Sequence, residues 1–143
     1  MRQEHKAEPI NFIVHLEATF STNDSVNFVF EYLPGQDLFW VIQNEMNLFL
    51  GKKKTNGGPR DWVKFYAAEI ITVLDILHSR NIIYRDLKPE NVMIDKDGHI
   101  KLIDFGFSKK LTPSNKFRTY TNCGTVGYTA PEVLMDTNQG YSF

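Results

Sequence analysis

The stretch Tyr84-Arg85-Asp86-Leu87-Lys88-Pro89-Glu90-Asn91 places an acid, a cation and an amide in one short segment. Apolar runs border this stretch on both sides, which predicts a tight loop between two short strands. The carboxylate of Asp86 can accept a proton from a hydroxyl group, and the ammonium of Lys88 can neutralise charge on a phosphoryl group. Asn91 offers a neutral oxygen ligand for a hard cation such as Mg²⁺.

Two further motifs follow in the chain. Asp104-Phe105-Gly106 begins thirteen residues after Asn91, and Ala130-Pro131-Glu132 comes later. Asp104 adds a charged oxygen to the neutral oxygen of Asn91, and such a pair from adjacent loops suits Mg²⁺ that is shared with a nucleotide. The three motifs in this order predict transfer of the terminal phosphoryl group of ATP to a protein hydroxyl.

The composition is that of one globular domain. Apolar residues make up 42% of the chain, charged residues 23%, and the net charge is -1, so overall charge predicts no nucleic-acid partner. No apolar run approaches the length of a membrane span. The single cysteine, Cys123, cannot form a disulfide within the chain, which favours a cytoplasmic, reducing setting.

The hydrophobic pattern predicts an α+β fold. Apolar residues alternate over 14–20, and a second apolar run follows at 26–32 after a turn, which is typical of an antiparallel hairpin. Apolar residues recur every three or four positions over 59–79, which predicts an amphipathic helix whose aromatic stripe lies in the core.

Short strands are predicted after this helix, at 82–83, 92–94 and 100–103. Asp95-Lys96-Asp97-Gly98 separates the last two strands and predicts a hairpin turn. Residues 107–129 are polar and predict a mobile loop.

These motifs make the chain similar to the eukaryotic protein kinases, and specifically to the AGC group, which includes the cyclic-nucleotide-dependent kinases. The resemblance is carried by Tyr84 in place of the commoner histidine, by the run 104–109 (DFGFSK) and by the run 121–132 (TNCGTVGYTAPE). It covers nearly the whole chain, with an apparent insertion near residues 43–58. It departs from the group at Val126-Gly127, where Pro-Glu is usual.

The resemblance implies a partial protein-kinase-like fold over residues 1–143. The end of the small lobe would span 1–32, the hinge 33–37, and part of the helical large lobe 38–143. None of the nine glycines gives Gly-x-Gly-x-x-Gly, and no strand lysine precedes Phe12, so we expect an incomplete catalytic domain with little activity by itself. One alternative is a truncated, non-catalytic pseudokinase that acts as a binding or regulatory module, and a weaker one is a small-molecule kinase.

The resemblance also implies catalytic roles. Asp86 would be the catalytic base and Lys88 the contact to the phosphoryl group in transfer. Asn91 and Asp104 would bind Mg²⁺. Thr125 would hydrogen-bond Asp86 and Lys88 and form part of the substrate platform, which favours a Ser or Thr substrate.

For ATP, the resemblance implies contacts near the hinge. The backbone of Glu31 and Leu33 would hydrogen-bond the adenine, with Phe30 as gatekeeper behind it and Met93 packed beneath it. Asp37 lies where the group places an acidic contact to the ribose.

Regulation and substrate choice follow from the same resemblance. Thr121 matches the activation-loop site that an upstream kinase phosphorylates, and Arg85 and Lys109 are the cations expected to pair with its phosphate. Glu90, together with Asp37, would attract basic residues upstream of the target Ser or Thr in a protein substrate.

The apolar faces of helix 59–79 and of the strands around 92–103 have no obvious partner in this sequence. We therefore expect an exposed apolar patch on these elements, which would favour aggregation of the chain alone.

Overall fold

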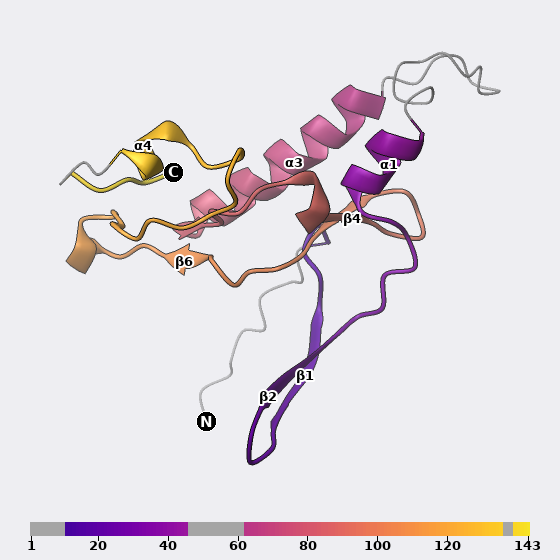
Figure 1. Cartoon of the computed structure of the whole chain (residues 1–143), viewed down its shortest axis with the longest axis horizontal. Coiled ribbons are helices and arrows are strands. Elements are labelled where there is room, and N and C mark those ends of the chain that lie inside the picture. Colours follow the sequence, from indigo (N-terminus) through magenta and orange to yellow (C-terminus); the bar gives the residue numbers. More distant parts are fainter. Residues whose placement is uncertain (1–10, 46–61, 136–138) are drawn as a thin grey trace.

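The computed structural model describes residues 11–45, 62–135 and 139–143 (Figure 1). The described strands form three two-stranded antiparallel sheets, β1–β2, β3–β6 and β4–β5. This mixture of helices and small antiparallel sheets confirms the predicted α+β class. The elements in chain order are β1 (Leu16–Ser21), β2 (Val26–Phe30), α1 (Leu38–Asn44), α3 (Trp62–Ser79), β3 (Ile82–Ile83), the 3-10 helix η1 (Pro89–Asn91), β4 (Val92–Ile94), β5 (Ile100–Leu102), β6 (Lys109–Lys110), the 3-10 helix η2 (Pro113–Asn115) and α4 (Pro131–Leu134).

Helix α3 provides one wall of the main hydrophobic core, as the helical periodicity predicts. Its buried apolar residues are Tyr66, Val73 and Leu77, and the helix contacts β3 and β5. Phe65 is an exception within the predicted stripe, because its side chain is 37% exposed. The predicted helix start at 59–61 lies outside the described residues. No helix in the described part of the chain is long and apolar enough to cross a membrane.

The β4–β5 hairpin supplies the opposite wall of this core. Its turn forms where the sequence predicts it: the carboxylate of Asp95 accepts the N–H groups of Asp97 (2.9 Å) and His99 (3.0 Å). Gly98 has φ +89°, the left-handed region that glycine adopts most readily. The strand side chains that face the core are at most 1% exposed; they are Val92, Ile100 and Leu102.

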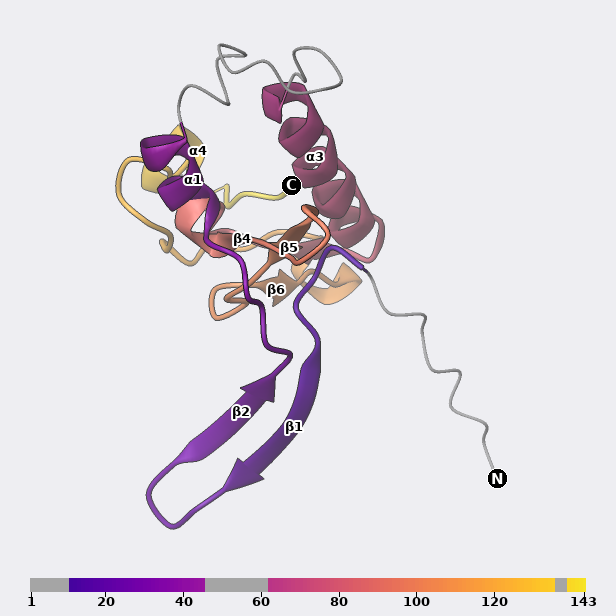
Figure 2. The same ribbon diagram turned by 90° about the vertical axis from the view of Figure 1, so that its right-hand side faces the viewer.

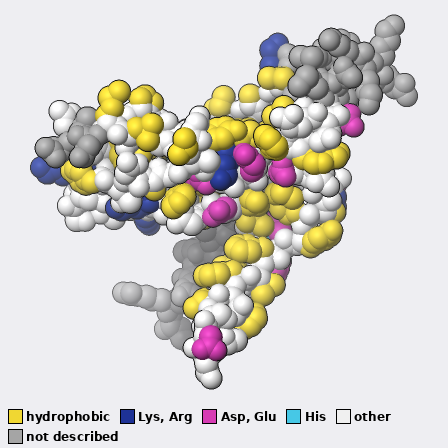
Figure 3. Space-filling model, viewed as in Figure 1, with side chains coloured by type: hydrophobic (Ala, Val, Ile, Leu, Met, Phe, Trp, Pro, Cys, Tyr) yellow, Lys and Arg dark blue, Asp and Glu magenta, His cyan; other side chains and the backbone are white. Residues whose placement is uncertain are grey.

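The expected exposed patch is therefore only partly correct. It is wrong for the strands around 92–103, because α3 contacts β5, α1 contacts β4, and the core-facing side chains of both strands are buried. On α3 itself Val63 and Ile71 are 53% and 67% exposed. The larger apolar surface lies on β1 and β2, which form the predicted hairpin and project away from the rest of the molecule (Figures 2 and 3). The exposed large apolar side chains of this hairpin are Leu16, Phe20, Val26, Phe28, Val29 and Phe30.

Residues 31–37, which include the predicted hinge 33–37, connect β2 to α1, a helix that the sequence pattern does not predict. Asp37 caps it by accepting the N–H of Trp40 at 2.7 Å, and Leu38 is buried in the core. Gly35 passes so close to β4 that a Cβ there would lie 1.8 Å from the carbonyl oxygen of Ile94. Of the predicted insertion near 43–58, positions 43 and 44 end α1, position 45 follows them, and the remainder lies outside the described residues.

The polar segment 107–129 is more structured than a plain loop. It contains β6, which pairs with β3, and the short helix η2. Further along, Thr119 and Tyr141 form an antiparallel bridge through two backbone hydrogen bonds of 2.9 Å each. Tyr141 packs with Ile83 and Leu111 in a second, smaller core.

Candidate active site

Asp86 lies at the centre of a group of polar side chains from two distant parts of the chain. It is only 5% exposed. One carboxylate oxygen accepts the hydroxyl of Thr125 at 2.6 Å, and the other accepts the amide nitrogen of Asn91 at 2.9 Å. Lys88 Nζ lies 3.3 Å from that second oxygen and donates to the Thr125 hydroxyl at 2.9 Å. Asp86, Lys88, Asn91 and Thr125, which the resemblance assigns to catalysis, are thus in direct contact.

These contacts keep Asp86 ionised despite its burial. Burial by itself would raise the pKa of this carboxyl, but hydrogen bonds from Thr125, Asn91 and Lys88 together lower the pKa below its ordinary value. The group is therefore a carboxylate near neutral pH and can accept a hydrogen bond from a hydroxyl group brought to it.

Asn91 ends η1 just before β4, and Asp104 follows β5, the strand that pairs with β4. The N–H of Ile103, the residue before Asp104, donates to the Asn91 carbonyl at 3.0 Å. The Asn91 side-chain nitrogen donates to both Asp86 Oδ2 and the Asp86 carbonyl, so the amide oxygen of Asn91 is left for a cation. Asp104 is exposed, with φ +54°, and one carboxylate oxygen accepts the Gly106 N–H at 3.0 Å.

The described residues fit Mg²⁺ shared with a nucleotide better than a metal held by protein alone. No group of three or more His, Cys, Asp or Glu side chains among them could hold a metal ion. One carboxylate at Asp104 and one amide oxygen at Asn91 leave most of the octahedral sites of Mg²⁺ for phosphate oxygens and water.

Two of the residues predicted to contact the nucleotide lie beside this group. Asp37 and Met93 form an antiparallel bridge, so the predicted ribose contact sits next to the residue predicted beneath the adenine. The N–H of Glu31 donates to the His15 carbonyl at 2.9 Å, so its own carbonyl is the backbone group left for a ligand. Phe30 lies on β2 and is half exposed.

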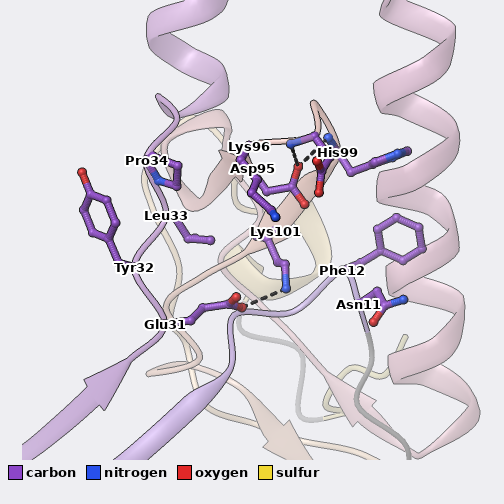
Figure 4. A pocket seen from close by; sticks show the side chains of 11 residues that line it. Asn11, Phe12, Glu31, Tyr32, Leu33, Pro34, Asp95, Lys96, His99 and Lys101 are labelled. Atoms are coloured by element: carbon purple, nitrogen blue, oxygen red, sulfur yellow. Dashed lines mark hydrogen bonds and ion pairs between the residues drawn. The ribbon is translucent and has the colours of Figure 1, made fainter.

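A cavity of about 450 Å³ lies between the hinge and the β4–β5 turn (Figure 4). Glu31 and Leu33 line it, but Met93 and Asp37 are not among the described residues that do. The Glu31 carboxylate accepts the ammonium of Lys101 at 2.8 Å, and this hydrogen bond lowers the pKa of Glu31. The described residues that line the cavity do not include Asp86, but they do include the predicted adenine contacts Glu31 and Leu33.

Arg85 and Lys109, the cations predicted to pair with a phosphate on Thr121, converge on Thr119. Arg85 Nη1 and Lys109 Nζ lie 3.3 Å and 3.1 Å from the Thr119 hydroxyl. Thr119 is completely buried, whereas Thr121 is exposed two residues further on. Glu90, the predicted contact for basic residues, is exposed on η1.

Comparison with known proteins identifies the family. The protein kinase domain matches residues 3–143. The chain belongs to the protein kinase family. Among its relatives, the RAC serine/threonine-protein kinase of Drosophila melanogaster is 45% identical over 90% of this chain and 19% of its own length. The human cAMP-dependent protein kinase catalytic subunit PRKX is 43% identical over 90% of this chain and 32% of its own length.

A third relative, cAMP-dependent protein kinase type 3 of Saccharomyces cerevisiae, is 44% identical over 86% of this chain and 27% of its own length. The chain thus spans less than a third of the length of these three relatives. One of the three is named a RAC serine/threonine-protein kinase and the other two are named cAMP-dependent protein kinases, which confirms the resemblance to the AGC group.

Three features of the site have no signal in the kinase motifs. Thr119 and Tyr141 contact Arg85 from segments more than thirty residues away. Lys101 contacts Glu31, and both residues line the cavity. Glu69 is a buried acid on α3, and its carboxylate accepts the Ile100 N–H at 3.0 Å and contacts His99 Nδ1 at 2.5 Å. A glutamate in the middle of an apolar helical stripe was the signal that could have pointed to this last contact.

Proposed function

We propose that the protein transfers the γ-phosphoryl group of Mg-ATP to Ser or Thr hydroxyl groups of protein substrates. The observation that carries the proposal is the convergence of Thr125, Lys88 and Asn91 on the buried carboxylate of Asp86. Family membership and the AGC-type relatives support the same reaction.

In the proposed reaction, the substrate hydroxyl donates to the Asp86 carboxylate and attacks the γ-phosphorus. The new oxygen–phosphorus bond forms as the bond to the ADP oxygen breaks, and the hydroxyl proton passes to Asp86. A base with a lowered pKa is adequate here, because the transition state for phosphoryl transfer is loose and asks chiefly for positioning. Lys88, 2.9 Å from Thr125 and 3.3 Å from Asp86, supplies positive charge beside the transferred group.

Asn91 and Asp104 would hold Mg²⁺, which neutralises phosphate charge when bound. The Glu31 carbonyl and the Leu33 backbone would contact the adenine, with Phe30 behind it. Met93 would lie beneath the adenine, and the bridge between Met93 and Asp37 supports the assignment of Asp37 to the ribose.

Substrate choice and activation form the second part of the proposal. Glu90 and Asp37 would select basic residues upstream of the target. An upstream kinase would phosphorylate Thr121, whose exposure makes it accessible, and Arg85 and Lys109 would pair with the phosphate. We place this reaction in the cytoplasm, where Mg-ATP is abundant and the lone Cys123 stays reduced.

The decisive experiment compares the protein with its Asp86→Asn variant, using Mg-ATP and a Ser-containing basic peptide. We expect kcat to fall by about 100-fold to 10⁴-fold, because this is the range that a general base contributes. The KM for ATP should change much less. Asp75→Asn, the same change on the exposed face of α3, is the matched control and should keep full activity. Equal activity of the Asp86→Asn and Asp75→Asn variants would reject Asp86 as the base.

A protein that binds Mg-ATP or a substrate peptide but transfers no phosphate under any condition would instead favour the non-catalytic reading. Isothermal titration of the same three proteins separates the two outcomes, because binding is measured without turnover.

A further inference from the structure

Tyr141 joins the segment after Ala-Pro-Glu to both the activation segment and the catalytic loop. It is 7% exposed and lies in the small core with Ile83 and Leu111. Its backbone N–H donates to the Thr119 carbonyl, and its carbonyl accepts the Thr119 N–H, both at 2.9 Å. This pairing places Tyr141 beside Thr119, two residues before Thr121.

The phenol hydroxyl is bonded in both directions. It donates to the Thr121 carbonyl at 2.5 Å and accepts an N–H of Arg85 at 3.3 Å. Cys123 Sγ lies 3.8 Å from the same oxygen. A phenol hydroxyl has one donor and can accept more than one hydrogen bond, so its single donor is fully used by the Thr121 carbonyl.

The guanidinium of Arg85 makes a further hydrogen bond through its Nε atom. Its Nε donates to the Phe107 carbonyl at 2.5 Å, next to the Asp-Phe-Gly motif. Arg85 therefore connects the residue before Asp86 with Phe107, Thr119 and Tyr141. The guanidinium is held in place before any phosphate is present, and so is the backbone at Thr121.

We propose that Tyr141 is a positioning residue that anchors the Thr121 main chain beside Arg85, so that a phosphate on Thr121 meets Arg85 and Lys109 with little further movement. This inference rests on the activation role proposed for Thr121. Tyr141 touches neither substrate nor nucleotide in this scheme; it acts through Arg85 and the activation segment. Removing the hydroxyl leaves a backbone carbonyl without its donor and frees the segment to move away from the cation.

The test uses Tyr141→Phe, which removes one oxygen and keeps the packed ring. The matched control is Tyr120→Phe in the same segment, because Tyr120 is 65% exposed. Each protein is prepared unmodified and with phosphothreonine incorporated at position 121. Two quantities are measured: the ratio of kcat between the two forms, and the rate of backbone hydrogen–deuterium exchange in the peptide that covers Thr119 and Thr121.

We expect Tyr141→Phe to reduce the activation ratio about fivefold, which corresponds to one neutral hydrogen bond. Exchange in the unmodified form should become faster, while Tyr120→Phe changes neither quantity. A purely structural role for the hydroxyl would lower activity equally in both forms and leave the ratio unchanged, and that outcome would overturn the proposal.

The two proposals fail in different ways. If phosphothreonine at position 121 does not activate the wild-type protein, the activation role of Thr121 is rejected. In that case hydrogen exchange still tests whether Tyr141 anchors the Thr121 main chain. Faster exchange only in Tyr141→Phe supports this role, and equal exchange in Tyr141→Phe and Tyr120→Phe rejects it.

Discussion

Thr125 is 39 residues from Asp86 in sequence, yet its hydroxyl hydrogen-bonds both Asp86 and Lys88, so its removal tests the proposed site directly. Thr125→Val keeps the shape of the side chain and deletes a 2.6 Å hydrogen bond to a carboxylate that is 5% exposed. Hydrogen bonds to charged groups contribute about 1.5–3 kcal/mol. Loss of this amount in the transition state lowers kcat by about 10- to 150-fold.

The same variant should also change the pH profile. Burial raises the pKa of Asp86, and among the contacts that lower this pKa the Thr125 hydrogen bond has the largest effect. Deleting that bond raises the pKa, and the reaction needs the ionised carboxylate, so activity on the acidic side should be lost at a higher pH than in the wild type. Thr125→Ser retains the hydroxyl and should keep most of the activity and the original acid limb.

The assay is steady-state phosphorylation of a basic Ser peptide between pH 5 and 8 for the wild type and both variants. A Thr125→Val protein with normal kcat and an unmoved acid limb would refute the reasoning, because it would show that Asp86 does not depend on this contact. A Thr125→Ser protein as impaired as Thr125→Val would show that packing, rather than the hydroxyl, matters.

Two further predictions concern stability. Gly35→Ala should destabilise the protein by about 3 kcal/mol in urea unfolding, because its Cβ would lie 1.8 Å from the Ile94 carbonyl oxygen and the backbone must move; Gly98→Ala, with open space around it and only a positive φ to strain, should cost about 1 kcal/mol. The hydrogen bond and charge of Glu69 raise the pKa of His99, so the pair stabilises the fold fully below the ordinary histidine pKa of about 6.5 and less as pH rises through the raised value. The melting temperature of the wild type should therefore exceed that of His99→Gln more at pH 6 than at pH 8.5, and a gap that does not change with pH would contradict this.

The local sequence pattern was enough to predict the elements that short-range interactions stabilise. The turn at Asp95–Gly98 follows from short-range hydrogen bonds of Asp95, and α3 follows from its apolar period. The catalytic contacts among Asp86, Lys88 and Asn91 lie within six residues, so the loop that carries them limits how far apart they can be. The motif order supplied the remaining step, from a loop to a reaction.

Long-range contacts could not be predicted in the same way. The sequence predicts both the helix α3 and the strands around 92–103, but it does not predict that they pack against each other. The strands were therefore expected to be exposed. Helix α1 was not predicted from the sequence. The Asp37 carboxylate, which was predicted only as a ligand contact, caps this helix, and Leu38 is buried in the core. The contact of Tyr141 with Arg85 spans 56 residues and leaves no periodic or motif signal.

These long-range contacts have a consequence for how the site works. Asp86 and Arg85 are neighbours, but each is positioned by a different distant group: Asp86 by Thr125, and Arg85 by Thr119 and Tyr141. Thr119 and Thr125 lie at the two ends of one short segment that includes Thr121. In the proposed mechanism, a change at Thr121 would reach Asp86 through Thr125 and Arg85 through Tyr141. In this mechanism the loop would carry the reacting groups, and the activation segment would determine whether they are aligned.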